Sequence, residues 1–310
     1  MNDDDSGLTR LAFIGFGEAA TAFLGGWDAL RPAHIAAYDL KGAAIADRYR
    51  RYGVAGCARP GQALDTVQAV WCLVTADQAL TAAEAAAPVL SAGTLWLDGN
   101  SCAPQTKRAA AAAIETAGGR YVDVAIMAPV HPARHRAPLL LSGPHSAAAG
   151  RMLKSLGMQP STVGARVGEA SAIKMIRSVM IKGMEALSAE CFLAARRAGV
   201  EDRVLASLDA SNPEIAWAQQ GAYNLGRMMA HGARRAAEMH EAAQTVAGLG
   251  LGGGMSSATA AWQARIAALG VAPGADDLVT LADRLLAGLS APPPPDRTLC
   301  AAETTKSDRG

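Results

Sequence analysis

The pattern of hydrophobic and polar positions changes character a little beyond the middle of the chain. Up to about residue 165, short apolar runs alternate with segments of helical periodicity. This alternation is typical of a parallel sheet that helices cover on both faces. We expect strands at 11–14, 35–38, 54–56, 69–74, 94–97, 121–124, 138–142 and 161–163, and helices near 18–30, 42–52, 60–64, 77–86, 103–117 and 145–155. The predicted fold class is α/β, with a doubly wound, mostly parallel sheet.

Everything beyond Gly168 has a helical pattern. A single proline-free helix is predicted from Glu169 to about Ala198, followed by helices near 201–209, 213–232, 233–248, 255–269 and 274–288. The change of pattern predicts an α/β domain over 8–165 and an all-helical domain over 166–290, joined by the long helix. Residues 291–310 contain four consecutive prolines and then polar residues, which predicts a disordered tail.

The first apolar run leads into a pattern of glycines. Residues 11–20 read LAFIGFGEAA, which combines a short strand, a tight turn and the start of a helix. The spacing G-x-G-x-x-A would permit the turn, the close approach of a pyrophosphate and the packing of helix on strand. The first amides of the helix also attract phosphate. The residues expected around a dinucleotide here are Gly15, Phe16, Gly17, Glu18, Ala19 and Ala20.

An acidic residue ends the next predicted strand. Asp39 follows 35–38 and can accept hydrogen bonds from both ribose hydroxyls of an adenosine, while it would repel a 2′-phosphate. Strand, glycines, helix and acid together predict a Rossmann domain, with an ordinary βαβ turn as the alternative. NAD is favoured, and NADP is possible because Lys41 and Arg48 could serve a phosphate.

A second glycine-rich stretch lies at 248–254, but helix-forming residues precede it rather than a strand. We therefore expect an interhelical loop there and not a second nucleotide site.

Two further strand ends carry small or polar side chains. Val74 and Thr75 end one apolar run, and side chains of this size would let a ribose and a nicotinamide pass. Asn100 and Ser101 follow the next run, where amide and hydroxyl donors could hold a carboxylate or a substrate hydroxyl. The alternatives are an ordinary strand-to-helix turn and a helix N-cap loop.

Lys174 lies one to two turns into the long predicted helix. Its neighbours on both sides are apolar, so the segment is expected to be mostly buried. Burial lowers the pKa of a lysine, which suits a general base at neutral pH. Ser178 and Lys182 follow at intervals of four residues, so polar groups gather along one face. An ordinary solvated lysine is the alternative.

Composition excludes several classes of function. The chain has a net charge of +1 and 5% aromatic residues, which argues against binding to nucleic acid or to an anionic membrane. The five cysteines form no C-x-x-C pair, so reduced thiols and a cytoplasmic location are expected, and no metal site is. Residues 1–10 do not read as a signal peptide, and no apolar run is long enough to span a bilayer.

Taken in order, these motifs resemble the β-hydroxyacid dehydrogenases, the family that includes 3-hydroxyisobutyrate dehydrogenase and 6-phosphogluconate dehydrogenase. Residues 98–101 (DGNS) are similar to the family's D-G-G-N-S loop, and 123–129 (DVAIMAP) stand in place of its D-A-P-V-S-G-G-like loop. Gly168 to Lys174 match the spacing of its G-x-G-x-x-x-K-x-x-N-N-like helix. The resemblance implies that Lys174 takes the substrate's hydroxyl proton while hydride leaves for the nicotinamide, and that Asn100 and Ser101 orient the substrate.

The chain departs from the family in two places. Met127-Ala128-Pro129 stand where relatives have the Ser-Gly-Gly that approaches the substrate carboxylate. Arg177 and Ser178 stand where relatives have asparagine after the lysine. Ser178 is expected to replace that asparagine in a pocket of different shape. With Lys182-Gly183 and 238–241 (EMHE), these features resemble the branch that carries a C-terminal domain of unknown function (DUF1932).

Substrate contacts are a weaker hypothesis. Met127, His131 and Arg134 are candidates on the loop after 121–124, with a solvated surface turn as the alternative for 131–136. His240 could reach the site from a partner subunit, although a structural role is the usual one for a helical histidine.

The function expected from the sequence is that of an NAD(P)-dependent oxidoreductase. Its substrate would be a small hydroxy acid or the keto or semialdehyde form, and the helical domain would build a homodimer. Oxidative decarboxylation and imine reduction on the same scaffold stay open as alternatives, although the lysine disfavours imine reduction. A non-catalytic dinucleotide-binding sensor is the alternative from a different class.

Overall fold

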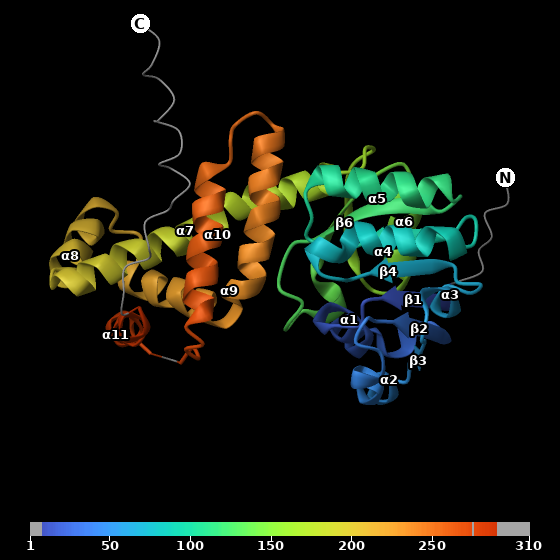
Figure 1. Ribbon diagram of the computed structural model, residues 1–310, viewed down its shortest axis with the longest axis horizontal. Helices are drawn as coiled ribbons and strands as arrows, with labels where there is room; N and C mark the ends of the chain where they lie inside the picture. Colours follow the sequence, from blue (N-terminus) through green and yellow to red (C-terminus); the bar gives the residue numbers. More distant parts are fainter. Residues whose placement is uncertain (1–7, 275, 290–310) are drawn as a thin grey trace, which may run out of the picture. The chain divides into compact units, whose positions relative to one another are not determined.

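The computed structural model describes residues 8–274 and 276–289. Eight strands form one sheet in the order β3-β2-β1-β4-β5-β6-β7-β8. Figure 1 labels β1 to β4 and β6 of this sheet. All neighbouring strands are parallel except β6 and β7, which are antiparallel. The strands are β1 (Arg10–Ile14), β2 (His34–Tyr38), β3 (Ala55–Gly56), β4 (Ala69–Cys72), β5 (Leu95–Asp98), β6 (Arg120–Ile126), β7 (Pro138–Ser142) and β8 (Gln159–Gly164). The predicted α/β class and mostly parallel Rossmann sheet are therefore confirmed.

Alternate residues of the central strands enter two different apolar clusters. In β1, Leu11 and Phe13 belong to one cluster, whereas Ala12 and Ile14 belong to the other. The same alternation separates Trp71 of β4 from its neighbours. Because successive side chains of a strand point to opposite faces, a sheet buried on both faces needs apolar residues at every position. This explains why these strands read as continuous apolar runs.

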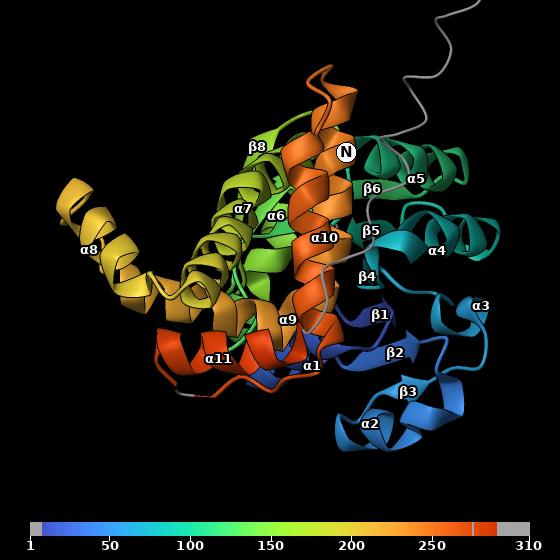
Figure 2. The same cartoon turned by 60° about the vertical axis from the view of Figure 1, so that its left-hand side comes forward.

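Helices cover both faces of the sheet (Figures 1 and 2). One cluster includes side chains of α1 (Glu18–Trp27), α2 (Ala46–Arg51) and α6 (Ser146–Ser155). The other includes side chains of α4 (Ala79–Ala86) and α5 (Pro104–Thr116), close to the short α3 (Pro60–Ala63). Short 3-10 turns complete this part: η1 (Asp28–Leu30), η2 (Gly42–Ile45), η3 (Ala76–Gln78), η4 (Ala87–Val89) and η5 (Arg134–Arg136).

The remaining elements are all helical: α7 (Glu169–Ala198), α8 (Glu201–Ser211), α9 (Trp217–Gly248), α10 (Gly254–Ala268) and α11 (Leu278–Gly288). The predicted division of 213–248 into two helices is wrong, because α9 is continuous. Gly232, at the predicted division, allows close packing within this helix region, since a Cβ there would lie 2.5 Å from the carbonyl oxygen of Gln263. Residues 249–253 connect α9 and α10, so the interhelical loop predicted at 248–254 is confirmed.

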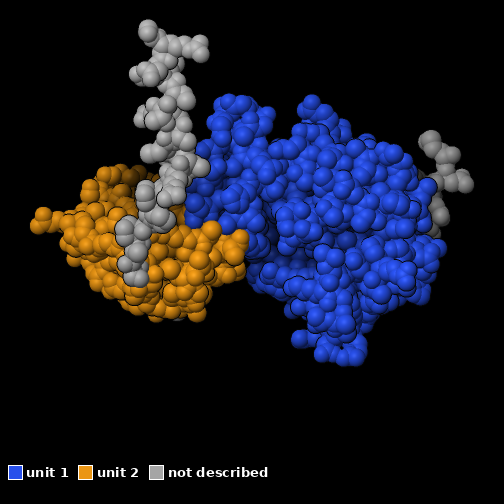
Figure 3. Space-filling model, in the orientation of Figure 1, with its two compact units in different colours: residues 1–183, 234–261 blue, residues 184–233, 262–310 orange. Residues whose placement is uncertain are grey.

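The chain divides into two compact units (Figure 3). Residues 1–183 and 234–261 make up the first, and residues 184–233 and 262–310 make up the second. The sheet ends at Gly164, next to the predicted domain boundary at 165, but the first unit also takes in the beginning of α7 and parts of α9 and α10. The domain limits stay a prediction, and the predicted tail at 291–310 lies outside the described residues.

Candidate active site

The predicted cofactor residues follow four strands at one edge of the sheet. Gly15 follows β1, Asp39 follows β2, Val74 and Thr75 follow β4, and Asn100 follows β5. In the sheet, β1 lies between β2 and β4, so the strand order reverses between β1 and β4. Open α/β sheets bind ligands at the carboxyl ends of the strands where the order reverses. The topology thus brings together the cofactor candidates that lie far apart in sequence.

The glycine turn has the geometry that a dinucleotide requires. Gly15 has φ +85°, and a Cβ there would lie 2.5 Å from the carbonyl oxygen of Leu73. Gly17 is the N-cap of α1, makes no side-chain capping hydrogen bond, and would have nothing within 4 Å of a Cβ. The space beside Gly17, before the first turn of α1, is therefore open, which fits the approach of a pyrophosphate to that turn. Ala20 is fully buried, as the close packing of α1 requires.

Asp39 holds the glycine turn against the end of β2. Its Oδ2 atom accepts a hydrogen bond of 2.8 Å from the Phe16 amide, and its Oδ1 atom accepts one of 2.8 Å from the Lys41 amide. Arg48 donates to the Phe16 carbonyl oxygen over 2.9 Å. Each carboxylate oxygen can accept a second hydrogen bond. Asp39 therefore has acceptor capacity left for ribose hydroxyls, and a guanidinium stands beside the same turn.

The loop after β5 presents an unexpected group. The Asn100 side-chain amide donates one hydrogen bond of 2.7 Å to Asp98 Oδ1 and one of 3.3 Å to Cys72 Sγ. Its Oδ1 atom is buried and has no hydrogen-bond partner. The amide donor that the sequence suggested for a ligand is therefore already used, and Asn100 offers an acceptor. Since an unpaired buried acceptor is costly, this atom fits a ligand that carries a hydroxyl or amide donor.

Lys174 on α7 and Ser101 meet beside this loop, although 73 positions separate them. The Lys174 ammonium donates to Ser101 Oγ over 2.7 Å. Burial lowers the pKa of Lys174 to about 8, against the attraction of Glu238, and nearby cations lower it further, namely Lys182, Lys107 and Arg234. A lysine with this pKa can take up or release a proton near neutral pH. The prediction that the segment around Lys174 is mostly buried is wrong, because Ile173, Ile176 and Arg177 are exposed. The Lys174 side chain itself has the lowered pKa expected of it.

Ser178 and Lys182 lie one and two turns beyond Lys174 on α7. Ser178 Oγ donates a hydrogen bond of 2.9 Å to the Lys174 carbonyl oxygen. Lys182 Nζ donates a hydrogen bond of 2.9 Å to Ser178 Oγ. Lys182 also pairs with Glu238 of α9 over 2.9 Å. Burial opposes the ionisation of Glu238, but Lys182 and Lys174 hold its pKa below the ordinary value. Glu238 therefore compensates the cations around Lys174, a role that the sequence signalled only through the motif at 238–241.

No contact was predicted from the sequence for Glu241, which lies one turn after Glu238. Its Oε2 atom accepts a hydrogen bond of 2.7 Å from the Ala103 amide, at the N-cap of α5. Burial raises the pKa of Glu241 above its ordinary value. Nothing in the sequence pattern relates position 241 to position 103.

The predicted substrate residues are dispersed. Met127 follows β6 and is half-buried, with its amide bonded over 2.9 Å to the Pro138 carbonyl oxygen. His131 is exposed, and the Arg134 guanidinium donates 2.7 Å to the Gly25 carbonyl oxygen of α1. His240 is exposed on α9. The hydrogen bond to α1 gives Arg134 a structural partner, and the substrate roles of these residues stay predictions.

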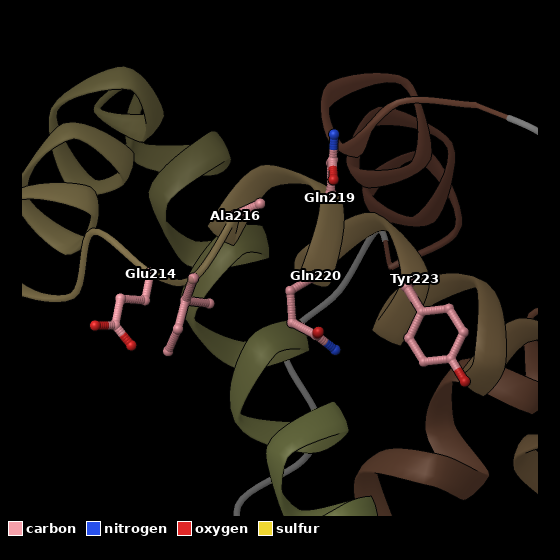
Figure 4. A pocket seen from close by; sticks show the side chains of 6 residues that line it. Glu214, Ala216, Gln219, Gln220 and Tyr223 are labelled. Carbon is pink, nitrogen blue, oxygen red and sulfur yellow. The ribbon is translucent and has the colours of Figure 1, made fainter.

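A cavity of about 410 Å³ occurs in the second unit (Figure 4). Residues at and just before the start of α9 line it: Glu214, Ile215, Ala216, Gln219, Gln220 and Tyr223. It contains none of the residues that the sequence predicts to carry chemistry.

The described residues contain three further features that bear on chemistry. Across residues 8–274 and 276–289, no group of three or more His, Cys, Asp or Glu side chains could hold a metal ion. The cysteines within these ranges (Cys57, Cys72, Cys102 and Cys191) are free thiols, and the prediction for Cys300 lies outside the described residues. No helix within them is long and apolar enough to cross a membrane.

Two family models match the chain. Residues 10–164 match the NAD binding domain of 6-phosphogluconate dehydrogenase, and residues 195–266 match a domain of unknown function (DUF1932). Among curated proteins, an uncharacterized 28.5 kDa protein of Methanothermus fervidus is 29% identical over 115 residues, which are 37% of this chain and 43% of that protein. The match thus spans less than half the length of that relative.

Solved structures match over nearly the whole chain. A conserved hypothetical protein of Sinorhizobium meliloti 1021 is 37% identical over 91% of this chain and 97% of that one, with a TM-score of 0.73. The conserved protein MTH1747, described as structurally similar to 3-hydroxyacid dehydrogenases, is 27% identical over 90% of this chain and 99% of that one, with a TM-score of 0.67. The 3-hydroxyisobutyrate dehydrogenase of Mycobacterium tuberculosis, solved with L-serine, shares the fold at 17% identity, 90% and 99% coverage and a TM-score of 0.67.

These matches agree with the geometry of the site. The first half of the chain is a nicotinamide-dinucleotide-binding domain, and the protein is of the hydroxyacid-dehydrogenase type of oxidoreductase. The chain belongs to the β-hydroxyacid dehydrogenase family, in the branch whose C-terminal region is a domain of unknown function.

Proposed function

We propose that the protein is an NAD-preferring dehydrogenase or reductase that interconverts a small hydroxy acid and its keto or semialdehyde form. One observation carries the proposal. Lys174 has a pKa of about 8, and its Nζ atom lies 2.7 Å from Ser101 Oγ. Ser101 and Asn100 are neighbours on the loop that follows β5. A proton-transfer group thus stands beside the strand ends at which this fold holds the nicotinamide.

Lys174 would act as the base in oxidation. In its neutral form it accepts the substrate's hydroxyl proton, the C–O bond becomes a carbonyl, and the hydride leaves the same carbon. When bound, the nicotinamide ring supplies the acceptor for that hydride. In reduction the ammonium form of Lys174 returns the proton to the alkoxide oxygen. Glu238 balances the charge of Lys174 and Lys182 in either direction.

Ser101 and Asn100 would orient the reacting groups. Ser101 Oγ accepts a hydrogen bond from Lys174 and keeps its own hydroxyl proton for a substrate oxygen. The unpartnered Oδ1 atom of Asn100 would accept a hydrogen bond from a hydroxyl or a carboxamide. Ser178 is bonded to the Lys174 carbonyl oxygen and to Lys182, so its contribution would be to fix α7 around the lysine.

The preference for NAD rests on the end of β2. Asp39 keeps free acceptor positions for the two ribose hydroxyls, and its charge would repel a 2′-phosphate. Arg48 is bonded to the Phe16 carbonyl oxygen, which occupies part of its donor capacity.

We also propose that the protein is a homodimer. On α7, Ile173, Ile176 and Met180 are 43%, 47% and 65% exposed and recur every three or four residues. They therefore form an apolar stripe on one side of a helix. A second copy of the chain would remove this stripe from water.

The direct test begins with the cofactor. NAD is added to the protein in a thermal-shift measurement, and a panel of small hydroxy acids is then screened for NADH formation by absorbance. The proposal expects stabilisation by NAD and turnover with at least one hydroxy acid. Stabilisation with no turnover in either direction over the panel would favour a dinucleotide-binding sensor instead.

A further inference from the structure

A buried lysine that the proposed chemistry does not use lies between two carboxylates. Lys107 of α5 is completely buried. Its ammonium donates 2.7 Å to the Asp98 carbonyl oxygen and 2.9 Å to Asp98 Oδ1, and it lies 3.5 Å from Asp123 Oδ1. One cation thus joins the end of β5 to the middle of β6.

The first carboxylate organises the loop that holds Asn100 and Ser101. Asp98 Oδ1 accepts hydrogen bonds from the Asn100 backbone amide over 3.0 Å and from its side-chain amide over 2.7 Å. Asp98 Oδ2 accepts one of 2.6 Å from the Tyr121 hydroxyl. The orientation of Asn100, including its free Oδ1 atom, therefore depends on the position of Asp98.

The second carboxylate organises the beginning of α7. Asp123 Oδ2 accepts hydrogen bonds of 3.1 Å and 3.0 Å from the amides of Gly168 and Ser171, and Oδ1 accepts one from the Ser171 hydroxyl. Ser142 Oγ donates a hydrogen bond of 3.0 Å to Asp123 Oδ2 and accepts one of 3.0 Å from the Ala170 amide. The amides of a first helical turn have no partner within the helix, and here Asp123 and Ser142 bind them. Lys174 lies one turn further on.

We propose that Lys107 is a positioning residue that couples the Asn100–Ser101 loop to the first turn of α7 and thereby sets the contact between Ser101 and Lys174. Asp98 binds the loop that carries Ser101, and Asp123 binds the first turn of the helix that carries Lys174. Lys107 contacts both of these carboxylates. The coupling itself needs no substrate or cofactor. Only its importance for catalysis rests on the proposed function.

The electrostatics support a charged bridge. Burial alone would lower the pKa of Lys107, but Asp98 and Asp123 raise it above the ordinary value, so the ammonium form persists. Removal of the cation would leave two carboxylates in a buried space, a strongly destabilising arrangement that the chain would relieve by separating them. The same cation lowers the pKa of Lys174, so its loss should be visible at the lysine as well.

The test measures amide hydrogen exchange of the full chain without ligands. In Lys107→Met, exchange at 98–101 and at 168–171 should become faster together, by about tenfold or more, the ratio expected when a buried hydrogen bond is lost. Thr94→Val is the matched control, because it removes another buried hydrogen bond, of 3.1 Å to Val67, just before β5. At equal loss of thermal stability, Thr94→Val should leave both segments protected.

A second measurement reads the lysine directly. The chain has six lysines, so carbon NMR of ε-labelled lysine can follow each one after assignment by substitution. The Lys174 midpoint should move upward from about 8 in Lys107→Met and stay in place in Thr94→Val. The other charged groups that act on Lys174 (Glu238, Lys182 and Arg234) are unchanged in both variants.

If Lys107→Met alone does not fold, Lys107→Met with Asp98→Asn removes the bridge at an unchanged net charge of the cluster. This variant leaves every direct partner of α7 intact, yet 168–171 should exchange faster. Unchanged protection of 168–171 in whichever variant folds, or equal loss in Thr94→Val, would overturn the proposal. Because neither measurement requires turnover, a failure here is distinct from a failure of the proposed dehydrogenase activity.

Discussion

The side chains of Lys174 and Ser101 form a hydrogen bond of 2.7 Å between α7 and the loop after β5. This contact connects the part of the chain that could transfer a proton with the part that would face the nicotinamide. The glycine turn at the end of β1 would determine where a dinucleotide lies but contains no group that could take a proton from a hydroxyl. The chemistry therefore depends on how α7 is attached to the sheet.

The two glycines of the turn should respond differently to alanine. Gly15→Ala should lower the free energy of unfolding by about 1–3 kcal/mol for its positive φ alone, with a further cost from the contact with the Leu73 carbonyl oxygen. Gly17→Ala should fold as stably as the wild type, because a Cβ there meets no protein atom within 4 Å. It should nevertheless lose stabilisation by NAD, since the methyl group occupies the open space before α1. Denaturant unfolding and thermal shifts with NAD measure both effects. A Gly17→Ala variant that binds NAD normally would show that the pyrophosphate does not lie there.

Asp39 should decide between the two cofactors. Asp39→Asn should weaken NAD binding about tenfold or more, because a charged acceptor for the ribose hydroxyls is lost. It should leave NADP binding unchanged or stronger, because the repulsion of the 2′-phosphate disappears. Titration calorimetry with each cofactor gives the ratio of the dissociation constants. Arg48→Ala serves as the comparison and should weaken NADP more than NAD. An equal loss for both cofactors in Asp39→Asn would mean that Asp39 acts only by holding Phe16.

The apolar stripe of α7 should control the oligomeric state. Met180→Glu should convert a dimer to a monomer in analytical ultracentrifugation, because an interface would bury the new carboxylate without a partner. Glu190→Lys, an exposed charge change further along the same helix, is the control and should leave the dimer intact. A wild-type chain that sediments as a monomer at all concentrations would refute the proposed dimer.

The sequence predicted the sheet well because its signals are local. The central strands β1, β4 and β5 are short apolar runs, and Gly15 and Asp39 directly follow β1 and β2, where a dinucleotide site would use them. The division of α9 after position 232 was wrong. Gly232 lies in the middle of a continuous helix, where it permits a close approach to the backbone of Gln263, 31 positions away.

The polar contacts of the site could not be predicted either, because most of them join residues that lie far apart in the sequence. The orientation of Asn100 depends on Asp98 and Cys72, and the start of α7 depends on Asp123, 45 residues before Gly168. Lys107 gave no signal at all, because a lysine in a predicted helix is usually solvated. Lys174 was identified because its apolar neighbours and its resemblance to a family motif agreed.

The most direct test of the central claim is the substitution Lys174→Ala, with Lys154→Ala on the exposed surface of α6 as the control. NAD should stabilise both variants as it does the wild type, since Lys174 is not among the residues expected to bind the dinucleotide. Turnover of a hydroxy acid should fall by a factor of about 10² to 10⁴ in Lys174→Ala and remain unchanged in Lys154→Ala.

The pH dependence of the same reaction identifies the group. Oxidation needs neutral Lys174, so its rate in the wild type should rise as the pH increases through about 8, and the rate of reduction should fall over the same range. We predict that this transition is lost in Lys174→Ala together with the activity. Undiminished turnover with the transition still present would contradict the assignment of Lys174 as the acid–base residue.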